Sequence, residues 1–204
     1  MLIVVRHGRT KSNASGLLLG RADPPLDETG RAQAAAAAAV LTRADRVVSS
    51  PLTRTRETAA CIAAAAEVEV EVDESFVELD YGEWDERPLT DVTPEEWAAW
   101  RADVTWSPPG GESLAALGAR VRAGLDALAA DAAERDVVVV THVSPVKAAV
   151  AWALGVGDET SWRMFVQPAS ITRIALARGG RSLVAFGEMA HLDGPAVSGV
   201  VPGT

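Results

Sequence analysis

The stretch Val4-Val5-Arg6-His7-Gly8-Arg9-Thr10, near the start of the chain, places a histidine between two arginines where an apolar run ends. Neighbouring cations repel one another, so this arrangement requires a physical reason. The run 2–5 is short, continuous and apolar, and it reads as a buried strand. We therefore expect the charged residues to stand just past a strand end, where they face a negatively charged ligand.

Apolar runs of this kind alternate along the chain with longer alanine- and leucine-rich stretches. The alternation is typical of α/β proteins, in which helices cover both faces of a largely parallel sheet. The expected strands are 2–5, 46–49, 68–72, 137–141, 172–176 and 183–186, and the expected helices are about 27–42, 53–66, 94–103, 113–134 and 145–154. Gly179-Gly180 between the last two strands indicates a hairpin, so one edge of the sheet should be antiparallel. The predicted fold is thus a three-layer α/β/α sandwich with a mostly parallel sheet and one antiparallel edge strand.

The length and the breaks in the pattern bear on domain organisation. A chain of 204 residues suits one domain, which we expect over 1–204, with a small helical cap inserted around 80–112. The helix at 145–154 should begin with Ser144 as its N-cap and Pro145 at its first position. The tail from Gly194 onward is rich in glycine, proline and small residues, so it should pack loosely.

Composition excludes several classes of protein. A net charge of −9 argues against a general nucleic-acid binder or a protein of anionic membrane surfaces. The apolar N-terminus is too short for a signal peptide or a membrane span. The single cysteine, Cys61, excludes an internal disulfide and a cysteine-rich metal site, and it favours a reducing, cytoplasmic location. The oligomeric state is not readable from the sequence, and a homodimer is one option.

Three stretches share the order strand, polar group, helix start: VVRHGRT, VVSSPLTRT and VVVVTHVSP. In an open parallel sheet, ligands bind outside the carboxyl ends of the strands, so His7, Arg54 and His142 should meet, together with Arg6 and Arg9. A dianionic phosphoryl group would offset their repulsion, because guanidinium groups bind phosphate oxygens bidentately. The alternative is a structural histidine after a strand and solvated arginines on a helix. A cation at a helix N-terminus opposes the dipole, which favours an anion near Arg54.

The sequence also offers a nucleophile and an acid. It contains no P-loop, no Gly-x-Ser-x-Gly elbow and no Cys-x5-Arg loop, whereas a neutral histidine can form covalent intermediates near pH 7. Flanking arginines would bias His7 further toward its neutral form. Among the carboxylates of 78–86, Glu78 lies between Val77 and Leu79 and should be the most buried, which suits a general acid.

Five ordered blocks of sequence resemble the histidine phosphatase superfamily, the phosphoglycerate mutase-like group. They are Arg6-His7-Gly8-x-Thr10-x-x-Asn13, Ser50-Pro51-Leu52-x-Arg54-Thr55-x-Glu57-Thr58-Ala59, Glu78-Leu79-x-Tyr81-Gly82-x-Trp84, Gly110-Gly111-Glu112-Ser113, and His142 after its strand. The resemblance runs from residue 2 to about residue 192. The His-Val-Ser-Pro-x-Lys form, with Lys147, is similar to the acid phosphatase and α-ribazole phosphatase-like branch.

The resemblance implies roles for these residues. His7 would be the phosphorylated nucleophile, Arg6, Arg54 and His142 would bind the phosphoryl oxygens, and Glu78 would donate the proton, with no metal or cofactor. Further substrate contacts are expected from Gly8, Arg9, Thr10, Asn13, Arg21 and Val143. Gly8 would let the backbone turn close to the ligand. Asn13 could equally be a helix or turn cap, and Arg21 could be an exposed surface residue. Arg9 stands where the family usually has Glu or Gln, and its target is open.

Three functions follow as hypotheses. The preferred one is a metal-independent phosphatase that hydrolyses a small phosphate monoester through a phosphohistidine on His7. The second is phosphoglycerate mutase-type phosphoryl transfer, for which the chain is short and lacks an extra insertion before Gly110-Gly111-Glu112-Ser113. The third is a non-catalytic phosphate-binding protein on the same fold. The sequence does not name the ester.

Overall fold

The computed structural model describes residues 1–177 and 180–192, and its described strands form one six-stranded sheet in the order β3-β2-β4-β1-β5-β6. The bounds are β1 Leu2–Arg6, β2 Arg46–Ser49, β3 Val70–Val72, β4 Val137–Thr141, β5 Ile171–Ala177 and β6 Gly180–Glu188. Strands β3, β2, β4 and β1 are parallel. Strand β5 runs antiparallel to both β1 and β6. The predicted antiparallel edge is confirmed; the strand of opposite direction is β5, and β6 lies outside it.

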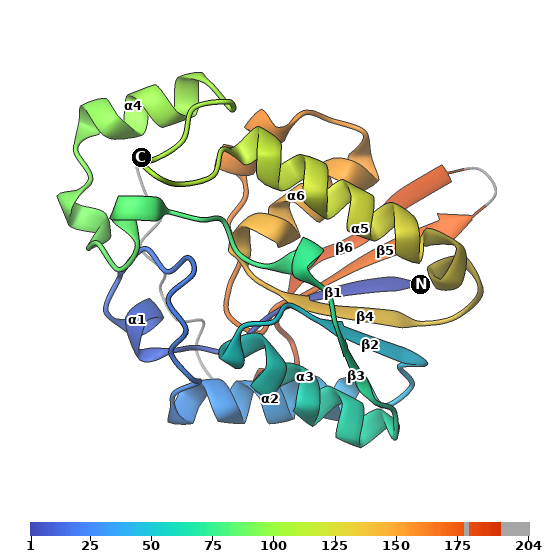
Figure 1. The fold of residues 1–204 in the computed structure, drawn as a ribbon. Coiled ribbons are helices and arrows are strands. Elements are labelled where there is room, and N and C mark those ends of the chain that lie inside the picture. The colour runs from blue at the N-terminus through green and yellow to red at the C-terminus, as the bar shows by residue number, and fades with distance from the viewer. Residues whose placement is uncertain (178–179, 193–204) are drawn as a thin grey trace.

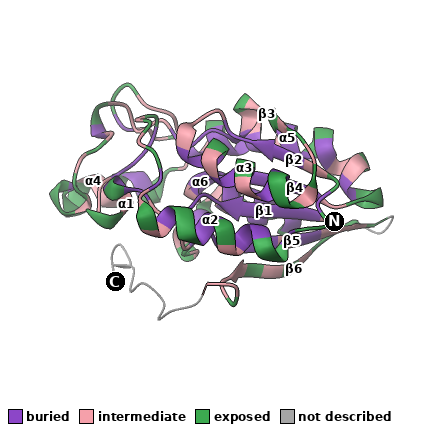
Figure 2. Ribbon diagram, turned by 90° about the horizontal axis from the view of Figure 1, so that it is seen from below, coloured by how far each residue is buried: buried purple, intermediate pink, exposed green. Residues whose placement is uncertain are grey.

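Helices cover both faces of the sheet (Figure 1). One face carries α2 (Glu28–Val40) and α3 (Thr53–Ala66), and the other carries α5 (Leu114–Glu134) and α6 (Val143–Leu154). Alternate residues of β1 enter different cores: Ile3 and Val5 pack with the α2 and α3 side, and Leu2 and Val4 with the α5 and α6 side. Two apolar cores explain why the central strands are continuous apolar runs, and Figure 2 shows these strands buried along their length. The three-layer prediction is confirmed.

Residues 80–112 lie beyond the carboxyl end of β1, near the short helix α1 (Lys11–Ala14) (Figure 1). They contain the 3-10 turns η2 (Gly82–Trp84) and η3 (Leu89–Asp91) and the helix α4 (Pro94–Ala102). Trp100 anchors α4, with its ring stacked on Trp97 at 5.6 Å and edge-on to Trp162 at 5.0 Å between centroids. This aromatic packing fixes the segment above the strand ends.

The start of α6 differs from the prediction. The helix begins at Val143, with His142 at the N-cap position, so Ser144 is not the cap and Pro145 stands at the third helical position. The capping acceptor is the Glu78 carboxylate, which takes the N–H groups of Val143 and Ser144. Pro145 is tolerated because first-turn N–H groups have no intrahelical partner. The sequence did not show this because the cap comes from a distant segment.

The tail from Gly194, and Gly179 of the predicted turn, lie outside the described residues. Within the described ranges, no helix is long and apolar enough to cross a membrane. The remaining 3-10 turns are η1 (Glu74–Phe76) and η4 (Asp158–Arg163).

Candidate active site

The two histidines predicted to meet are neighbours because of strand register. Strands β1 and β4 pair in parallel with Arg6 opposite Thr141, so the next residues, His7 and His142, leave the sheet side by side. Their ring centroids are 5.2 Å apart at an interplanar angle of 65°. Both side chains are buried. The tertiary structure thus places two imidazoles from distant parts of the chain in one site.

Arg54, near the N-terminus of α3, reaches this pair with a fully buried side chain. Its Nε donates to Nδ1 of His142 at 3.2 Å, and its two terminal nitrogens donate to the carbonyl oxygens of Gly20 and Ala22, each at 2.7 Å. Arg54 therefore links the loop around residues 20–22 to the histidines. Burial lowers the pKa of Arg54, and the charge of Glu78 opposes this shift.

Arg6 ends β1 and is also buried. Its Nη1 donates to the carbonyl oxygen of Val166 at 2.7 Å, while its Nε is a buried donor that has no hydrogen-bond partner among the described residues. Burial lowers the pKa of Arg6 to about 10, against the attraction of Glu78. A buried guanidinium nitrogen that lacks an acceptor is costly, and an anionic oxygen in the site would supply one.

The contacts of His7 determine which ring nitrogen is free. Nδ1 lies 2.7 Å from the carbonyl oxygen of Gly8, and because a carbonyl can only accept, Nδ1 carries the proton and donates it. Nε2 of the neutral ring then keeps its lone pair. Burial lowers the pKa of His7 well below its usual value, and the charges of Arg54 and Arg6 add to the shift. His7 is therefore held as a neutral imidazole with a nucleophilic Nε2.

His142 takes the opposite tautomer. Its Nδ1 accepts from Arg54, so Nε2 carries the proton and donates to Oγ of Ser50 at 2.7 Å. Burial lowers its pKa well below the usual value, followed by the charges of Arg54 and His7. Ser50 directly follows β2 and was not predicted as a site residue. It belongs to the second sequence block, which was the available signal.

Glu78 enters the site from the loop after η1. It is 3% exposed, and its carboxylate accepts three backbone N–H groups, from Leu79 at 2.8 Å, Val143 at 3.0 Å and Ser144 at 3.2 Å. Two of these donors belong to the first turn of α6, whose dipole also favours an anion. The expectation that Glu78 is the most buried carboxylate of its stretch agrees with this position. Val143 contributes here through its backbone.

Lys147 and Tyr81 border Glu78. Lys147 stands one turn after Val143 on α6, and burial lowers its pKa to about 8, with Glu78 opposing and Arg6 adding to the shift. Burial, followed by the charge of Glu78, raises the pKa of Tyr81. One carboxylate is thus surrounded by a lysine, an arginine and a neutral phenol.

Of the predicted outer residues, Thr10 and Asn13 cap a helix and Arg21 lies on the surface. Thr10 and Asn13 form a capping box at α1: Thr10 Oγ1 accepts from the Asn13 N–H at 3.2 Å, and Asn13 Oδ1 accepts from the Thr10 N–H at 3.1 Å. The capping alternative for Asn13 is therefore realised. Arg21 is exposed and lies 3.8 Å from a carboxylate oxygen of Glu112.

Arg9 does not join the cationic cluster, and that expectation is wrong. Its Nε donates to Asp27 at 2.7 Å, and its Nη2 donates to Thr29 Oγ1 at 2.8 Å. Asp27 is the N-cap of α2, so Arg9 holds the start of that helix instead of pointing toward His7. The side chain of Arg9 is turned away because a permanent carboxylate partner lies beside it.

Gly8 makes a close backbone contact with Gly30. A Cβ on Gly8 would lie 2.3 Å from the carbonyl oxygen of Gly30, and one on Gly30 would lie 2.0 Å from that of Arg9. The loop after β1 thus packs backbone to backbone on the first turn of α2. This contact by itself excludes a side chain at Gly8, and the predicted approach of its backbone to a ligand stays a prediction.

Asp85 is a second residue that sequence reasoning passed over. Its carboxylate accepts the backbone N–H groups of Gly20, Arg21 and Ala22 at 2.7–2.9 Å. Arg54 binds the carbonyl oxygens of Gly20 and Ala22. The N–H groups of this loop are thus bound by an acidic side chain and its carbonyl oxygens by a basic one. Asp85 directly follows the third sequence block, which ends at Trp84 and was the available signal.

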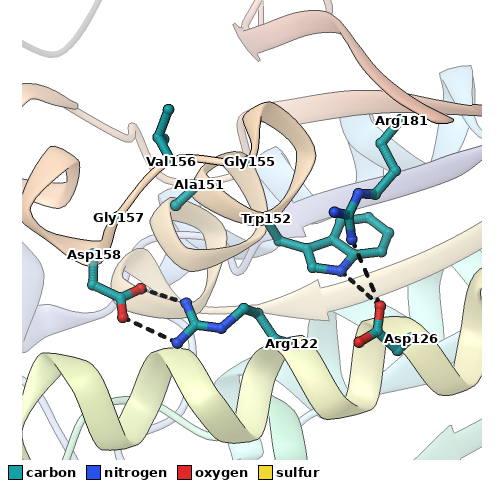
Figure 3. A pocket seen from close by; sticks show the side chains of 9 residues that line it. All are labelled: Arg122, Asp126, Ala151, Trp152, Gly155, Val156, Gly157, Asp158 and Arg181. Atoms are coloured by element: carbon teal, nitrogen blue, oxygen red, sulfur yellow. Dashed lines mark hydrogen bonds and ion pairs between the residues drawn. The ribbon is translucent and has the colours of Figure 1, made fainter.

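A cavity of about 450 Å³ lies elsewhere, between α5, the end of α6 and β6, and none of the predicted site residues lines it (Figure 3). Its charged groups are paired: Arg122 binds Asp158 at 2.7 Å, and Asp126 accepts from Trp152 Nε1 at 2.8 Å. Arg181 lies over the Trp152 ring at 4.3 Å. In the described part of the chain, no group of three or more His, Cys, Asp and Glu side chains could hold a metal ion.

Comparisons with known proteins agree with this geometry. The family model "Histidine phosphatase superfamily (branch 1)" matches residues 2–189. The bifunctional protein Rv2228c of Mycobacterium tuberculosis is 35% identical in an alignment of 189 positions that covers 90% of this chain and 52% of that protein. The chain thus spans about half the length of the first curated relatives it matches.

Two further matches extend over whole chains. The probable phosphoglycerate mutase GpmB of Yersinia enterocolitica is 32% identical, with 96% of both chains covered. A mycobacterial glucosyl-3-phosphoglycerate phosphatase, solved with VO3, has a TM-score of 0.85 at 30% identity and covers 92% of this chain and 99% of its own. The family model covers residues 2–189, which include nearly all of the described sheet and helices. The chain therefore belongs to the histidine phosphatase superfamily.

Proposed function

We propose that this protein hydrolyses small phosphate monoesters, with His7 as the residue that receives the phosphoryl group. The observation that carries the proposal is the tautomer of His7: Nδ1 is bound to the Gly8 carbonyl oxygen, so the Nε2 lone pair is free beside buried cations. A neutral, oriented imidazole is the form a phosphoryl acceptor needs. The phosphatase named in the comparison supports hydrolysis as the reaction.

In the first transfer, Nε2 of His7 attacks phosphorus and the bond from phosphorus to the ester oxygen breaks. Glu78 supplies the proton that the leaving oxygen requires, so an alcohol departs and Glu78 is left as a carboxylate. The three backbone N–H groups around Glu78 stabilise that charge. Arg6, whose Nε has no partner among the described residues, and Arg54 are proposed to bind equatorial oxygens of the transferring group. His142 is proposed to bind one of these oxygens by exchanging the Ser50 hydroxyl, the acceptor of its Nε2–H group, for that oxygen.

In the second transfer, water attacks the phosphohistidine as Glu78 takes one of its protons. The bond between phosphorus and Nε2 breaks, inorganic phosphate leaves, and both His7 and Glu78 return to their starting states. No proton or electron is left unbalanced. Gly8, Thr10, Asn13, Arg21 and Val143 stay proposed substrate-side residues, and residues 80–112 are proposed to act as the cap over the ester. Cytoplasmic residence stays a prediction.

Mutase-type transfer is the second candidate, because GpmB, named a probable phosphoglycerate mutase, aligns over 96% of this chain. A mutase would return the phosphoryl group to a second hydroxyl instead of to water. The two reactions separate when phosphoglycerate is supplied: isomerisation faster than phosphate release would favour transfer.

The deciding experiment is hydrolysis of p-nitrophenyl phosphate in the presence of a chelator, with His7→Ala as the inactive variant and His191→Ala as the matched histidine control. We expect turnover in the wild type and in His191→Ala, and none in His7→Ala. Quenched wild-type samples should contain an acid-labile phosphohistidine. A folded wild type that binds phosphate but equals His7→Ala in turnover would establish the non-catalytic alternative.

A further inference from the structure

Every backbone carbonyl from residue 75 to residue 78 is bound by a side chain. Thr141, the last residue of β4, donates from Oγ1 to the carbonyl oxygen of Phe76 at 2.5 Å. The carbonyl oxygens of Ser75, Val77 and Glu78 all accept from Arg120, at 2.9, 2.7 and 3.1 Å. Connecting segments are normally mobile, and this one is fixed at four consecutive positions, the last of which is Glu78 itself.

Arg120 uses all of its hydrogen-bonding capacity at this place. Its Nη1 binds two carbonyl oxygens, its Nη2 binds Glu78 and one oxygen of Glu112 at 2.8 Å, and its Nε binds the other oxygen of Glu112 at 2.8 Å. An arginine has five N–H donors in a rigid fork, and each of them has an acceptor here. Arg120 projects from α5, a helix of the main sandwich, so the loop is tied to the rigid core.

Glu112 is itself held in place by the Gly110-Gly111-Glu112-Ser113 block. Its backbone N–H donates to the carbonyl oxygen of Asp80 at 2.8 Å. A Cβ on Gly111 would lie 2.5 Å from that same oxygen, so this loop packs directly on the residues after Glu78. Ser113 then caps α5, the helix that carries Arg120. The block therefore joins both sides of the Glu78 segment to α5, a role that the proposed chemistry leaves unassigned.

We propose that the Glu112–Arg120 ion pair is a positioning unit for proton donation, which sets where the Glu78 carboxyl group stands relative to the leaving oxygen. The inference rests on the proposed function, in which Glu78 is the proton donor. The N–H groups of Arg120 are all bound to Glu112 and to loop carbonyl oxygens, so we assign the pair to positioning and not to contact with the ester. Arg120 binds the main chain of Glu78, and its side-chain partner Glu112 fixes the plane of the guanidinium group.

Misplacement of a catalytic group by about 1 Å can cost on the order of 100-fold in rate. Such a loss depends on the substrate when the misplaced group is a general acid. A nitrophenolate leaves without help, whereas an alkoxide needs a proton. A defect in the position of Glu78 therefore appears as a greater sensitivity to the basicity of the leaving group.

The test is kcat/KM for phosphate esters of increasing leaving-group basicity, from p-nitrophenyl phosphate through phenyl phosphate to an alkyl phosphate. The ratio kcat/KM reports the first transfer even where phosphohistidine hydrolysis limits kcat. The variants are Arg120→Lys, which keeps the charge but not the fork, and Glu112→Gln, which keeps the shape. Arg122→Lys is the matched control, since Arg122 lies on the same helix in an ion pair with Asp158.

We expect the kcat/KM of Arg120→Lys to fall by less than about threefold on p-nitrophenyl phosphate and by about 30- to 100-fold on the alkyl phosphate. Glu112→Gln should show the same trend in kcat/KM across the esters with smaller losses. Arg122→Lys should have the kcat/KM values of the wild type. Thermal unfolding checks that each variant folds; if Arg120→Lys does not, Glu112→Gln carries the test. An equal loss on every ester, or the same gradient in Arg122→Lys, would overturn the inference.

Glu78→Gln separates this inference from the proposed function. One outcome is a loss of kcat/KM that rises steeply with leaving-group basicity in Glu78→Gln but is equal on every ester in Arg120→Lys. That result would overturn the positioning unit and leave Glu78 as proton donor. A flat response in Glu78→Gln would remove Glu78 from that role, and the inference would fail with it.

Discussion

His7 and His142 stand edge to face, with ring centroids 5.2 Å apart, and carry their protons on different ring nitrogens. His7 binds a backbone carbonyl through Nδ1, whereas His142 binds a serine through Nε2. The two neighbouring imidazoles are oriented by separate hydrogen-bond partners, and both are kept neutral.

His7 should stay neutral to a lower pH than a free imidazole. Burial and two arginines lower its pKa well below 6.5, so its protonation should begin only under acidic conditions. The measurement is an NMR titration of the ring, which is assignable because the chain has 3 histidines. Arg6→Gln should raise the pKa of His7, because one repelling cation is removed. A midpoint at or above 6.5 in the wild type would contradict the prediction.

Ser50→Ala should reduce kcat by about tenfold, since the protonated Nε2 of His142 loses the acceptor that orients the ring. Ser49→Ala is the control: its Oγ donates to the Ser50 carbonyl oxygen, which also accepts from Thr55. Both changes should lower the free energy of unfolding by about 1 kcal/mol. Equal kcat values for the two variants would show that Ser50 has only a structural role.

Arg9→Met should leave kcat/KM within about twofold of the wild type, because its guanidinium is bound to Asp27 and Thr29. The loss of this partly exposed ion pair should cost no more than about 1 kcal/mol of stability. Arg54→Met, by contrast, should abolish turnover. Steady-state kinetics and thermal unfolding check both variants. A large rise in KM for Arg9→Met would return Arg9 to the substrate site.

Gly30→Ala should destabilise the protein, although helix propensity by itself predicts a gain of about 1 kcal/mol. The new Cβ would stand 2.0 Å from the Arg9 carbonyl oxygen, in the first turn of α2. Overpacking of this kind costs about 1–3 kcal/mol. Because propensity and packing predict opposite signs, urea unfolding decides between them.

Lys147 should make stability rise with pH in the alkaline range. Its pKa is lowered from 10.5 to about 8 by burial, so between these values the unfolded chain binds more protons than the folded one. The free energy of unfolding must then increase with pH. Relative to Lys147→Met, the wild type should gain on the order of 1–3 kcal/mol from pH 8 to pH 10.5. A constant difference between the two proteins over this range would contradict the shift.

The sequence was most informative where local chemistry is decisive. Short valine runs predicted β2 and β4 at their observed bounds, because the central positions of strands buried on both faces are apolar. It was least informative where a distant group completes a local structure. The N-cap position of α6 was misplaced, since the capping carboxylate of Glu78 comes from another segment.

The order of residues along the chain by itself determined the α/β fold and the polar residues that follow each strand, because periodicity and residue type are local properties. Only the tertiary structure decided which of them meet. The parallel register of β1 and β4 brings His7 beside His142, the carboxylate of Asp27 draws Arg9 away, and Arg120 binds the segment that carries Glu78. Partner choice depends on distance and unsatisfied hydrogen bonds in three dimensions, which spacing along the chain does not encode.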